Sequence, residues 1–237
     1  MAGAGSRFVS AGFATPKPLI NVDNIPMFMK TITSIEDIEL DKKFIFIIRQ
    51  EHVDTQNLDK LIVDALPQAE VVVLPELTRG SAETALQAKP LLDREEPLIV
   101  MDCDLWFKSE SYNEMVNSVI NGTSDISGGV LTFKADNPRY SYALIEKDNI
   151  VTETAEKKVI SNNAITGAYF FATAKEFIDA CDKLLETPVS DEMPEYYLSL
   201  LYNILIDEGK KIQAAYVDEF ASFGTPEELE AYQSARG

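Results

Sequence analysis

Apolar and polar residues along this chain form two repeating patterns. The first is a set of short apolar runs, which predicts β-strands. Short runs rich in branched and aromatic residues recur, each bounded by polar or turn-forming residues. These runs cover residues 43–49, 69–75, 97–104, 125–133, 140–148 and 164–172. Their length and composition are typical of strands in a buried or half-buried sheet.

The second pattern places apolar residues three and four positions apart, which predicts amphipathic helices between the strands. These segments cover residues 54–66, 80–92, 111–121, 174–186 and 194–209. Proline cannot continue a helix, so Pro90 is expected to break the second segment near its end. Gly209 is expected to act as the C-terminal cap of the last one.

Strand and helix alternate through about the first 130 residues, an order typical of α/β folds. It predicts a mostly parallel sheet with helices on both faces. The later strands follow one another more closely along the chain, which predicts a small antiparallel extension of the sheet. This extension could form the side of a binding site that holds a second, acceptor substrate. The chain has no internal repeat, low-complexity segment or linker, so residues 1–237 are expected to form a single domain.

Charge narrows the classes of partner. The 237 residues carry a formal net charge of −18, and such a surface repels polyanions. Nucleic-acid binding is therefore not expected, and phosphate binding would need local Arg or Lys residues and a metal. Cys103 and Cys181 are expected to be reduced, buried thiols of a cytoplasmic protein. No apolar run is long enough to span a bilayer, so no membrane partner is expected.

The first candidate for chemistry is the opening "GAGSRF" at residues 3–8. Gly3 and Gly5 would let the backbone approach a polyphosphate closely. Arg7 and, ten residues later, Lys17 would neutralise phosphate charge. Two glycines alone are equally typical of a flexible turn, and the two cations favour a phosphate loop.

The second candidate is "DCD" at residues 102–104, at the end of an apolar strand. Asp102 and Asp104 would share one face because side chains two apart on a strand do so. Hard oxygen ligands suit Mg²⁺ bridging phosphate oxygens. A solvated strand end is the alternative interpretation.

Three weaker signals follow. Gly80 and Ser81 open a predicted helix after a strand, where backbone groups could face a nucleobase, or form an ordinary helix start. Glu156 and Lys157 precede a strand and could hold the hydroxyls and the phosphate of an acceptor, or lie on a solvated face. His52, the only histidine, is expected at the surface.

Together these motifs resemble the nucleotidyltransferase family that activates sugar 1-phosphates, including thymidylyl-, uridylyl- and small cytidylyltransferases. The matching segments occur in the family's order over almost the whole chain: 3–8, 16–20, 26–27, 79–86, 102–104, 138–145, 155–161, 166–171 and 224–229. The resemblance implies a GT-A-like (Rossmann-like) fold. It also implies that an acceptor phosphate attacks the α-phosphorus of a nucleoside triphosphate (NTP) and releases pyrophosphate, forming activated precursors of surface polysaccharide.

The resemblance also implies roles for individual residues. The triphosphate would be held by Gly3, Gly5, Arg7 and Lys17, with Arg7 and Lys17 catalytic through charge stabilisation. The base would be faced by Gly80 and Ser81. Mg²⁺ would be bound by Asp104, with Asp102 as a lesser candidate. The acceptor would be held by Glu156, Lys157, Thr166 and Gly167.

Two departures from the family pattern affect these expectations. Relatives usually have an apolar strand before the glycine loop, whereas this chain begins at the loop, so a few upstream residues are expected in the native protein. Relatives also often have a metal-binding Asp two residues before the "GTP" glycine, where this chain has Ser222. Asp218, four residues earlier, is a candidate to bind the metal in its place.

Several alternatives stay open at this level. The nucleotide is expected to be CTP or UTP, and the acceptor a hexose 1-phosphate or a smaller phosphate such as phosphocholine. A GT-A glycosyltransferase and a non-catalytic nucleotide sensor are the alternative functions. The aromatic stretch "EYYLSLLYNILI" (195–206) is expected to pack within the domain, with a homodimer surface as the alternative.

Overall fold

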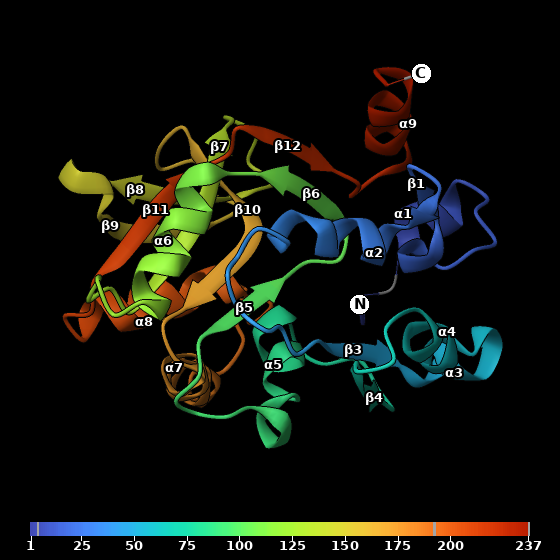
Figure 1. Cartoon of the computed structure of the whole chain (residues 1–237), viewed down its shortest axis with the longest axis horizontal. Coiled ribbons are helices and arrows are strands. Elements are labelled where there is room, and N and C mark those ends of the chain that lie inside the picture. Colours follow the sequence, from blue (N-terminus) through green and yellow to red (C-terminus); the bar gives the residue numbers. More distant parts are fainter. Residues whose placement is uncertain (4, 192, 237) are drawn as a thin grey trace. The chain divides into compact units, whose positions relative to one another are not determined.

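The computed structural model describes residues 1–3, 5–191 and 193–236. Ala4, inside the predicted glycine loop, lies outside the described residues. The chain forms two compact units. Unit 1 comprises Met1–Leu77, Asp102–Lys108 and Glu219–Gly237, and unit 2 comprises Thr78–Met101 and Ser109–Asp218. Each unit is described separately, and Figure 1 labels their elements.

Unit 1 is built from short helices and three small two-stranded sheets. Its elements in chain order are α1 (Ser6–Ser10), η1 (Lys17–Leu19), β1 (Asn21–Val22), β2 (Ile25–Pro26), α2 (Met27–Ile32), η2 (Thr33–Ile35), β3 (Ile45–Arg49), α3 (Gln50–Gln56), α4 (Leu58–Ala65), β4 (Glu70–Leu74), β6 (Leu105–Lys108), β12 (Glu219–Ser222) and α9 (Pro226–Ser234).

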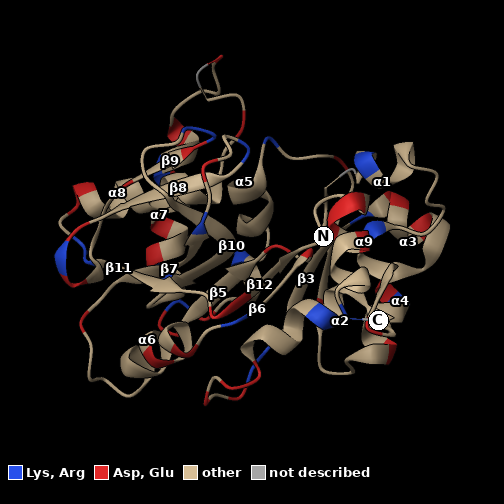
Figure 2. Cartoon of the chain, turned by 90° about the horizontal axis from the view of Figure 1, so that it is seen from above, with Lys and Arg blue, Asp and Glu red and all other residues tan. Residues whose placement is uncertain are grey.

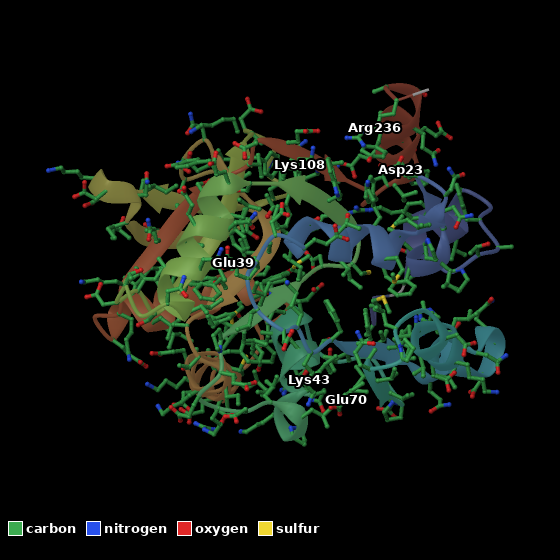
Figure 3. All side chains as sticks on the ribbon, viewed as in Figure 1. Asp23, Glu39, Lys43, Glu70, Lys108 and Arg236 are labelled. Atoms are coloured by element: carbon green, nitrogen blue, oxygen red, sulfur yellow. The ribbon has the colours of Figure 1, made fainter. Side chains whose placement is uncertain are left out.

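Segments far apart in the sequence share the cores of unit 1. Phe8, Trp106 and Phe223 are buried together, and Leu229 of α9 joins them. Just after α9, the Arg236 guanidinium lies 3.7 Å from the Asp23 carboxylate, and Figure 3 labels both side chains. Apolar burial supplies most of the stabilisation, because exposed ion pairs contribute little.

Unit 2 contains a six-stranded mixed sheet with helices packed on it. Its elements in chain order are α5 (Ser81–Leu86), η3 (Lys89–Leu91), β5 (Leu98–Met101), α6 (Glu110–Ile120), β7 (Gly128–Lys134), β8 (Ser141–Ile145), η4 (Lys147–Asn149), β9 (Val151–Glu156), β10 (Asn163–Phe171), α7 (Ala174–Glu186), η5 (Leu198–Leu200), α8 (Leu201–Asp207) and β11 (Ile212–Tyr216).

Strand pairing corrects the expectation of a mostly parallel sheet. Among the described residues, only β3 with β4 and β11 with β7 pair in parallel. Strand β10 pairs antiparallel with β5, β7 and β8, and β8 pairs antiparallel with β9. The order of elements along the chain predicted their type, but it does not determine which strand inserts beside which. Here β10, which comes late in the chain, is antiparallel to three other strands.

Helices cover both faces of the unit 2 sheet, and two adjacent glycines show why. Side chains of consecutive strand residues point to opposite faces. A Cβ added to Gly128 would lie 3.2 Å from the ring of Tyr202 in α8, whereas one added to Gly129 would lie 2.5 Å from Met115 Sδ in α6. The absence of side chains at these two positions lets both helices approach the sheet closely.

The helix predictions are confirmed in part. Helix α7 has the predicted bounds, α5 ends before Pro90, and Gly209 after α8 has φ +77°. The predicted helix 54–66 is wrong as a single element, because Asn57 is left-handed (φ 52°) and separates α3 from α4. The predicted helix 194–209 begins later than expected, since its first residues are extended or 3₁₀.

Surface properties agree with the composition. Asp and Glu positions, drawn red on the ribbon in Figure 2, lie on helices of both units, including α3 and α4 in unit 1 and α6 and α7 in unit 2. Cys103 is half-buried and Cys181 is buried, and both are free thiols. Among the described residues, no helix combines the length and apolarity that a bilayer crossing requires.

Candidate functional site

The predicted phosphate loop leads into helix α1 of unit 1. Gly5 is left-handed (φ +60°), and its carbonyl accepts from Phe8 N at 3.0 Å, which starts the helix. Gly3 is exposed, with open space where a Cβ would stand. The Arg7 side chain is exposed and forms no ion pair with the described residues. The loop thus presents backbone and a cation to solvent, as phosphate binding requires.

Lys17 and Asp104, 87 positions apart, form an ion pair in unit 1. The Lys17 ammonium also lies 5.4 Å from the centre of the Phe8 ring, which follows the glycine loop. Both side chains are mostly shielded, with exposures of 16% and 27%. Strong pairing at a shielded position restricts both groups to one geometry. The structure therefore brings together two of the residues that the sequence singled out.

Strand β12 places Ser222 beside this ion pair. It pairs with β6 so that Ser222 lies opposite Leu105, and Phe223 N donates to Asp104 O at 2.7 Å. A Cβ added to Gly224 would lie 3.0 Å from Glu228 Oε2, 3.3 Å from Ser222 Oγ and 4.0 Å from Asp104 Oδ2. Three oxygens therefore lie within 4.0 Å of that position, and carboxylate and hydroxyl oxygens are ligands that Mg²⁺ accepts. Glu228 Oε2 already accepts from Ser222 Oγ at 2.9 Å and from Thr225 N at 3.1 Å.

The other predicted metal ligands differ in their surroundings. Asp102 is exposed, two residues before Asp104. Asp218 belongs to unit 2, where its Oδ2 accepts from Glu110 N at 2.8 Å at the first turn of α6. That contact gives Asp218 a helix-capping role. The described residues contain no cluster of three or more His, Cys, Asp or Glu side chains arranged to hold a metal.

In unit 2, Gly80 and Ser81 are held against the backbone of Tyr196. Tyr196 N donates to Arg79 O at 2.9 Å, and Ala82 N donates to Tyr196 O at 2.8 Å. Ser81 Oγ accepts from Leu198 N at 3.2 Å. The start of α5 is thereby fixed by contacts with a distant segment, and its role in base recognition remains a prediction.

Glu156 and Lys157 lie at the end of β9. Glu156 Oε2 accepts from Ser199 Oγ at 2.8 Å and also from Ser141 Oγ. Lys157 is left-handed (φ 53°), and its Nζ donates to Tyr197 OH at 2.8 Å. That hydrogen bond raises the pKa of Lys157, so the side chain is a cation at neutral pH.

Thr166 and Gly167 occupy an irregular part of β10 in unit 2. The register of β10 against β7 shifts between Ile165 and Tyr169, and Gly167 has φ +100°. Thr166 is buried, with its Oγ1 accepting from Ala168 N at 3.3 Å. Bulges of this kind re-aim side chains and occur beside functional sites.

Sequence reasoning missed the residues that hold the candidate groups in place. Tyr197 and Ser199 lay in no matching segment, and Ser141 lay in the matching segment 138–145 without an assigned role. Their partners lie up to 43 positions away. Glu228 lies in the matching segment 224–229, but no role was predicted for it. His52, predicted to be a surface histidine, is half-buried on α3.

Comparison with known proteins supports the resemblance drawn from the motifs. The family described as nucleotidyl transferase matches residues 1–197. A nucleoside-diphosphate-sugar pyrophosphorylase from Vibrio cholerae RC9 is 27% identical, with a TM-score of 0.82 over 99% of this chain and 98% of that one. The inositol-1-phosphate CTP transferase from T. maritima is 16% identical, with a TM-score of 0.73 over 98% and 91%.

A curated relative, the bifunctional protein GlmU of Sulfurovum sp. (strain NBC37-1), is 23% identical over 223 residues. These are 92% of this chain and 48% of the relative, so the chain spans about half the length of that protein. The family match extends over most of the chain and includes the glycine loop, the Lys17–Asp104 pair and the Glu156–Lys157 pair. The chain belongs to the nucleotidyl transferase family.

Proposed function

We propose that this chain transfers a nucleoside monophosphate from an NTP to a small phosphorylated acceptor. An oxygen of the acceptor phosphate attacks the α-phosphorus, and the bond from that phosphorus to the oxygen bridging the β-phosphorus breaks. The electron pair of that bond leaves with pyrophosphate. The acceptor phosphate is already an anion, so the reaction needs no general base, and in-line positioning and charge stabilisation supply the rate.

The observation that carries this proposal is the Lys17–Asp104 ion pair beside the glycine loop. The triphosphate would be held by Gly3 and Gly5 backbone groups and by Arg7. Lys17, freed from Asp104 when phosphates arrive, would stabilise the charge that develops on the reacting phosphates. Charge-assisted hydrogen bonds of this kind are roughly twice as strong as neutral ones.

Asp104, with Asp102 as a second candidate, would hold Mg²⁺, and oxygens of Ser222 and Glu228 lie nearby. Bound Mg²⁺ would neutralise and orient the phosphate oxygens. Asp218 is the weaker candidate, because its carboxylate already accepts from the backbone of α6. A neutral Ser222 in place of a carboxylate implies weaker metal binding than two carboxylates would provide.

Unit 2 would recognise the remaining parts of the substrates. Gly80 and Ser81 would face the base, and we favour CTP or UTP. Glu156 would accept from acceptor hydroxyls, Lys157 would bind the acceptor phosphate, and Thr166 and Gly167 would line the same region. The 27% identity to a nucleoside-diphosphate-sugar pyrophosphorylase favours a role in nucleotide-sugar synthesis. We further propose that the product is made in the cytoplasm for surface polysaccharide.

Pyrophosphate release tests the proposal. The protein is incubated with Mg²⁺, each of the four ribonucleoside triphosphates or dTTP, and a panel of sugar phosphates and phosphocholine. We expect release that depends on one nucleotide and one acceptor. A parallel incubation with a nucleotide sugar that releases a nucleoside diphosphate instead would identify a glycosyltransferase. Tight nucleotide binding without turnover would identify a sensor.

A matched pair of variants tests the role that the proposal gives to Lys17 of the Lys17–Asp104 ion pair. Lys17→Ala should lower turnover by about a hundredfold, because one group that stabilises transition-state charge is lost. Lys43→Ala removes an exposed ion pair with Glu70 (2.6 Å), labelled in Figure 3, and should leave turnover unchanged. Equal effects of the two substitutions would contradict the role of Lys17.

A further inference from the structure

One short segment of unit 2, Tyr196–Ser199, whose last two residues begin η5, contacts both groups of predicted substrate-binding residues. We call this sequence the YYLS segment. Tyr196, Leu198 and Ser199 are buried, and the segment leads directly into α8. Sequence patterns treated it only as part of a helix. In the structure it precedes the helix and forms hydrogen bonds on two sides.

On one side the segment fixes the loop that is predicted to face the base. Its backbone exchanges hydrogen bonds of 2.9 and 2.8 Å with Arg79 and Ala82. The Arg79 guanidinium also lies 4.9 Å from the centre of the Tyr196 ring. These contacts leave the start of α5 little freedom to shift relative to the YYLS segment.

On the other side the segment holds the predicted acceptor pair. Ser199 Oγ donates to Glu156 Oε2 at 2.8 Å, and the Ser199 side chain is fully buried. Ser141 donates to the same oxygen. Glu156 Oε1 accepts no hydrogen bond from the described residues and remains available to a substrate hydroxyl. Tyr197 OH accepts from Lys157 Nζ, and its ring lies 4.7 Å from that ammonium.

The same contacts bear on the class of acceptor. A quaternary ammonium binds well against open aromatic faces. Three tyrosine rings of unit 2 already carry a cation on one face: Lys157 on Tyr197, Arg139 on Tyr140 and Arg79 on Tyr196. A second cation would be repelled there, whereas a hydroxyl beside Glu156 and a phosphate beside Lys157 would both be favoured.

We propose that Ser199 and Tyr197 are positioning residues that fix Glu156 and Lys157 for a hydroxylated phosphate, and that the YYLS segment makes the base loop and the acceptor pair one rigid recognition element. This inference rests on the proposed function, because it assigns the acceptor of the same reaction. The acceptor class is a sugar or cyclic polyol phosphate and not phosphocholine.

Steady-state kinetics of Ser199→Ala tests the positioning role. Loss of one donor to the Glu156 carboxylate should raise the KM for the acceptor about tenfold. The KM for the NTP should stay within about twofold, because the contacts of the segment with the base loop are made by other atoms. Ser118→Ala is the matched control, since it removes a hydroxyl bonded to Met115 O in α6 and should change neither constant.

A double-mutant cycle separates positioning from general packing. In the Glu156→Gln background, Ser199→Ala should add little to the acceptor KM, because the carboxylate through which it acts is already gone. Additive effects, or an equal rise in the NTP KM, would overturn the inference. Tyr197→Phe keeps the ring and removes one hydroxyl, so it provides a second variant if Ser199→Ala fails to fold.

Calorimetric titration gives a readout that does not require turnover. Wild-type protein is titrated with glucose 1-phosphate, inositol 1-phosphate and phosphocholine, and Tyr197→Phe and Ser199→Ala follow. We expect one of the two polyol phosphates to bind and both variants to weaken it. Preferred binding of phosphocholine, or unchanged affinity in both variants, would overturn the inference even if pyrophosphate release is observed. Polyol-phosphate binding without pyrophosphate release would instead refute only the proposed reaction.

Discussion

Replacing Gly80 with alanine probes how tightly the predicted base loop is packed. An added Cβ would lie 2.5 Å from Tyr196 O and 2.8 Å from Tyr196 C, and closer still to its nitrogen. These are backbone atoms, so no side-chain rotation can make room. Gly80 also has φ +152°, a conformation that residues with a side chain rarely adopt.

The cost of this substitution can be worked out from these contacts. Restoring an ordinary carbon–oxygen contact requires the Tyr196 backbone to move by about 1 Å. That movement would break the two hydrogen bonds to Arg79 and Ala82, at about 1 kcal/mol each. The unfavourable φ adds about 1–3 kcal/mol. Gly80→Ala should therefore lower the free energy of unfolding by about 3–5 kcal/mol.

Urea denaturation followed by circular dichroism measures this change. The matched control is Gly122→Ala, because Gly122 also has positive φ (+67°) but has no atom within 4 Å of an added Cβ. It should cost only about 1–2 kcal/mol. Equal costs for the two variants, or a Gly80→Ala protein as stable as wild type, would refute the close approach of Tyr196 to the loop.

Three further predictions concern the candidate site and pH. Asp104→Asn should lower turnover about a hundredfold while the protein stays folded, as measured by pyrophosphate release beside a melting curve; unchanged turnover would contradict its metal role. Ser222→Asp places a second carboxylate next to Glu228, so the melting temperature should fall without Mg²⁺ and rise more steeply with Mg²⁺ than in wild type; an identical Mg²⁺ response would contradict metal binding beside Ser222. Burial lowers the pKa of His52 below its usual 6.5, so below pH 6.5 the unfolded chain binds more protons than the folded one and stability should fall. His52→Gln should reduce this loss of stability between pH 7.5 and pH 5.5, as measured by urea titrations. The same loss in the variant as in wild type would refute the burial of His52.

Local patterns predicted the elements whose formation depends on local physics. Helix α7 was predicted residue by residue, because its apolar positions repeat at helical spacing and Thr173 caps its start. Asn57 divided a predicted helix because asparagine tolerates the left-handed conformation, a choice that the apolar pattern around it does not reveal.

Long-range partners were beyond the reach of such patterns. The sequence singled out Lys17 and Asp104 separately, and only the pairing of β12 with β6 and the burial of Phe8 and Phe223 explain their meeting. The YYLS segment carried an apolar, helix-like pattern, and its hydrogen bonds to Glu156 and Lys157 depend on where α8 begins. Strand direction was missed for the same reason, since pairing across β10 is decided by tertiary packing.

The most direct test of the proposed reaction follows the α-phosphorus itself. The protein is incubated with Mg²⁺, the acceptor phosphate and an NTP labelled with ³²P at the α-position, and products are separated by thin-layer chromatography. The label should appear in a product in which the α-phosphorus is joined to the acceptor phosphate by a phosphoanhydride bond. This product should form in equal amount to unlabelled pyrophosphate, and Lys17→Ala should slow both together. Label in a free nucleoside monophosphate or diphosphate, or pyrophosphate released without the acceptor, would contradict attack by the acceptor phosphate on the α-phosphorus.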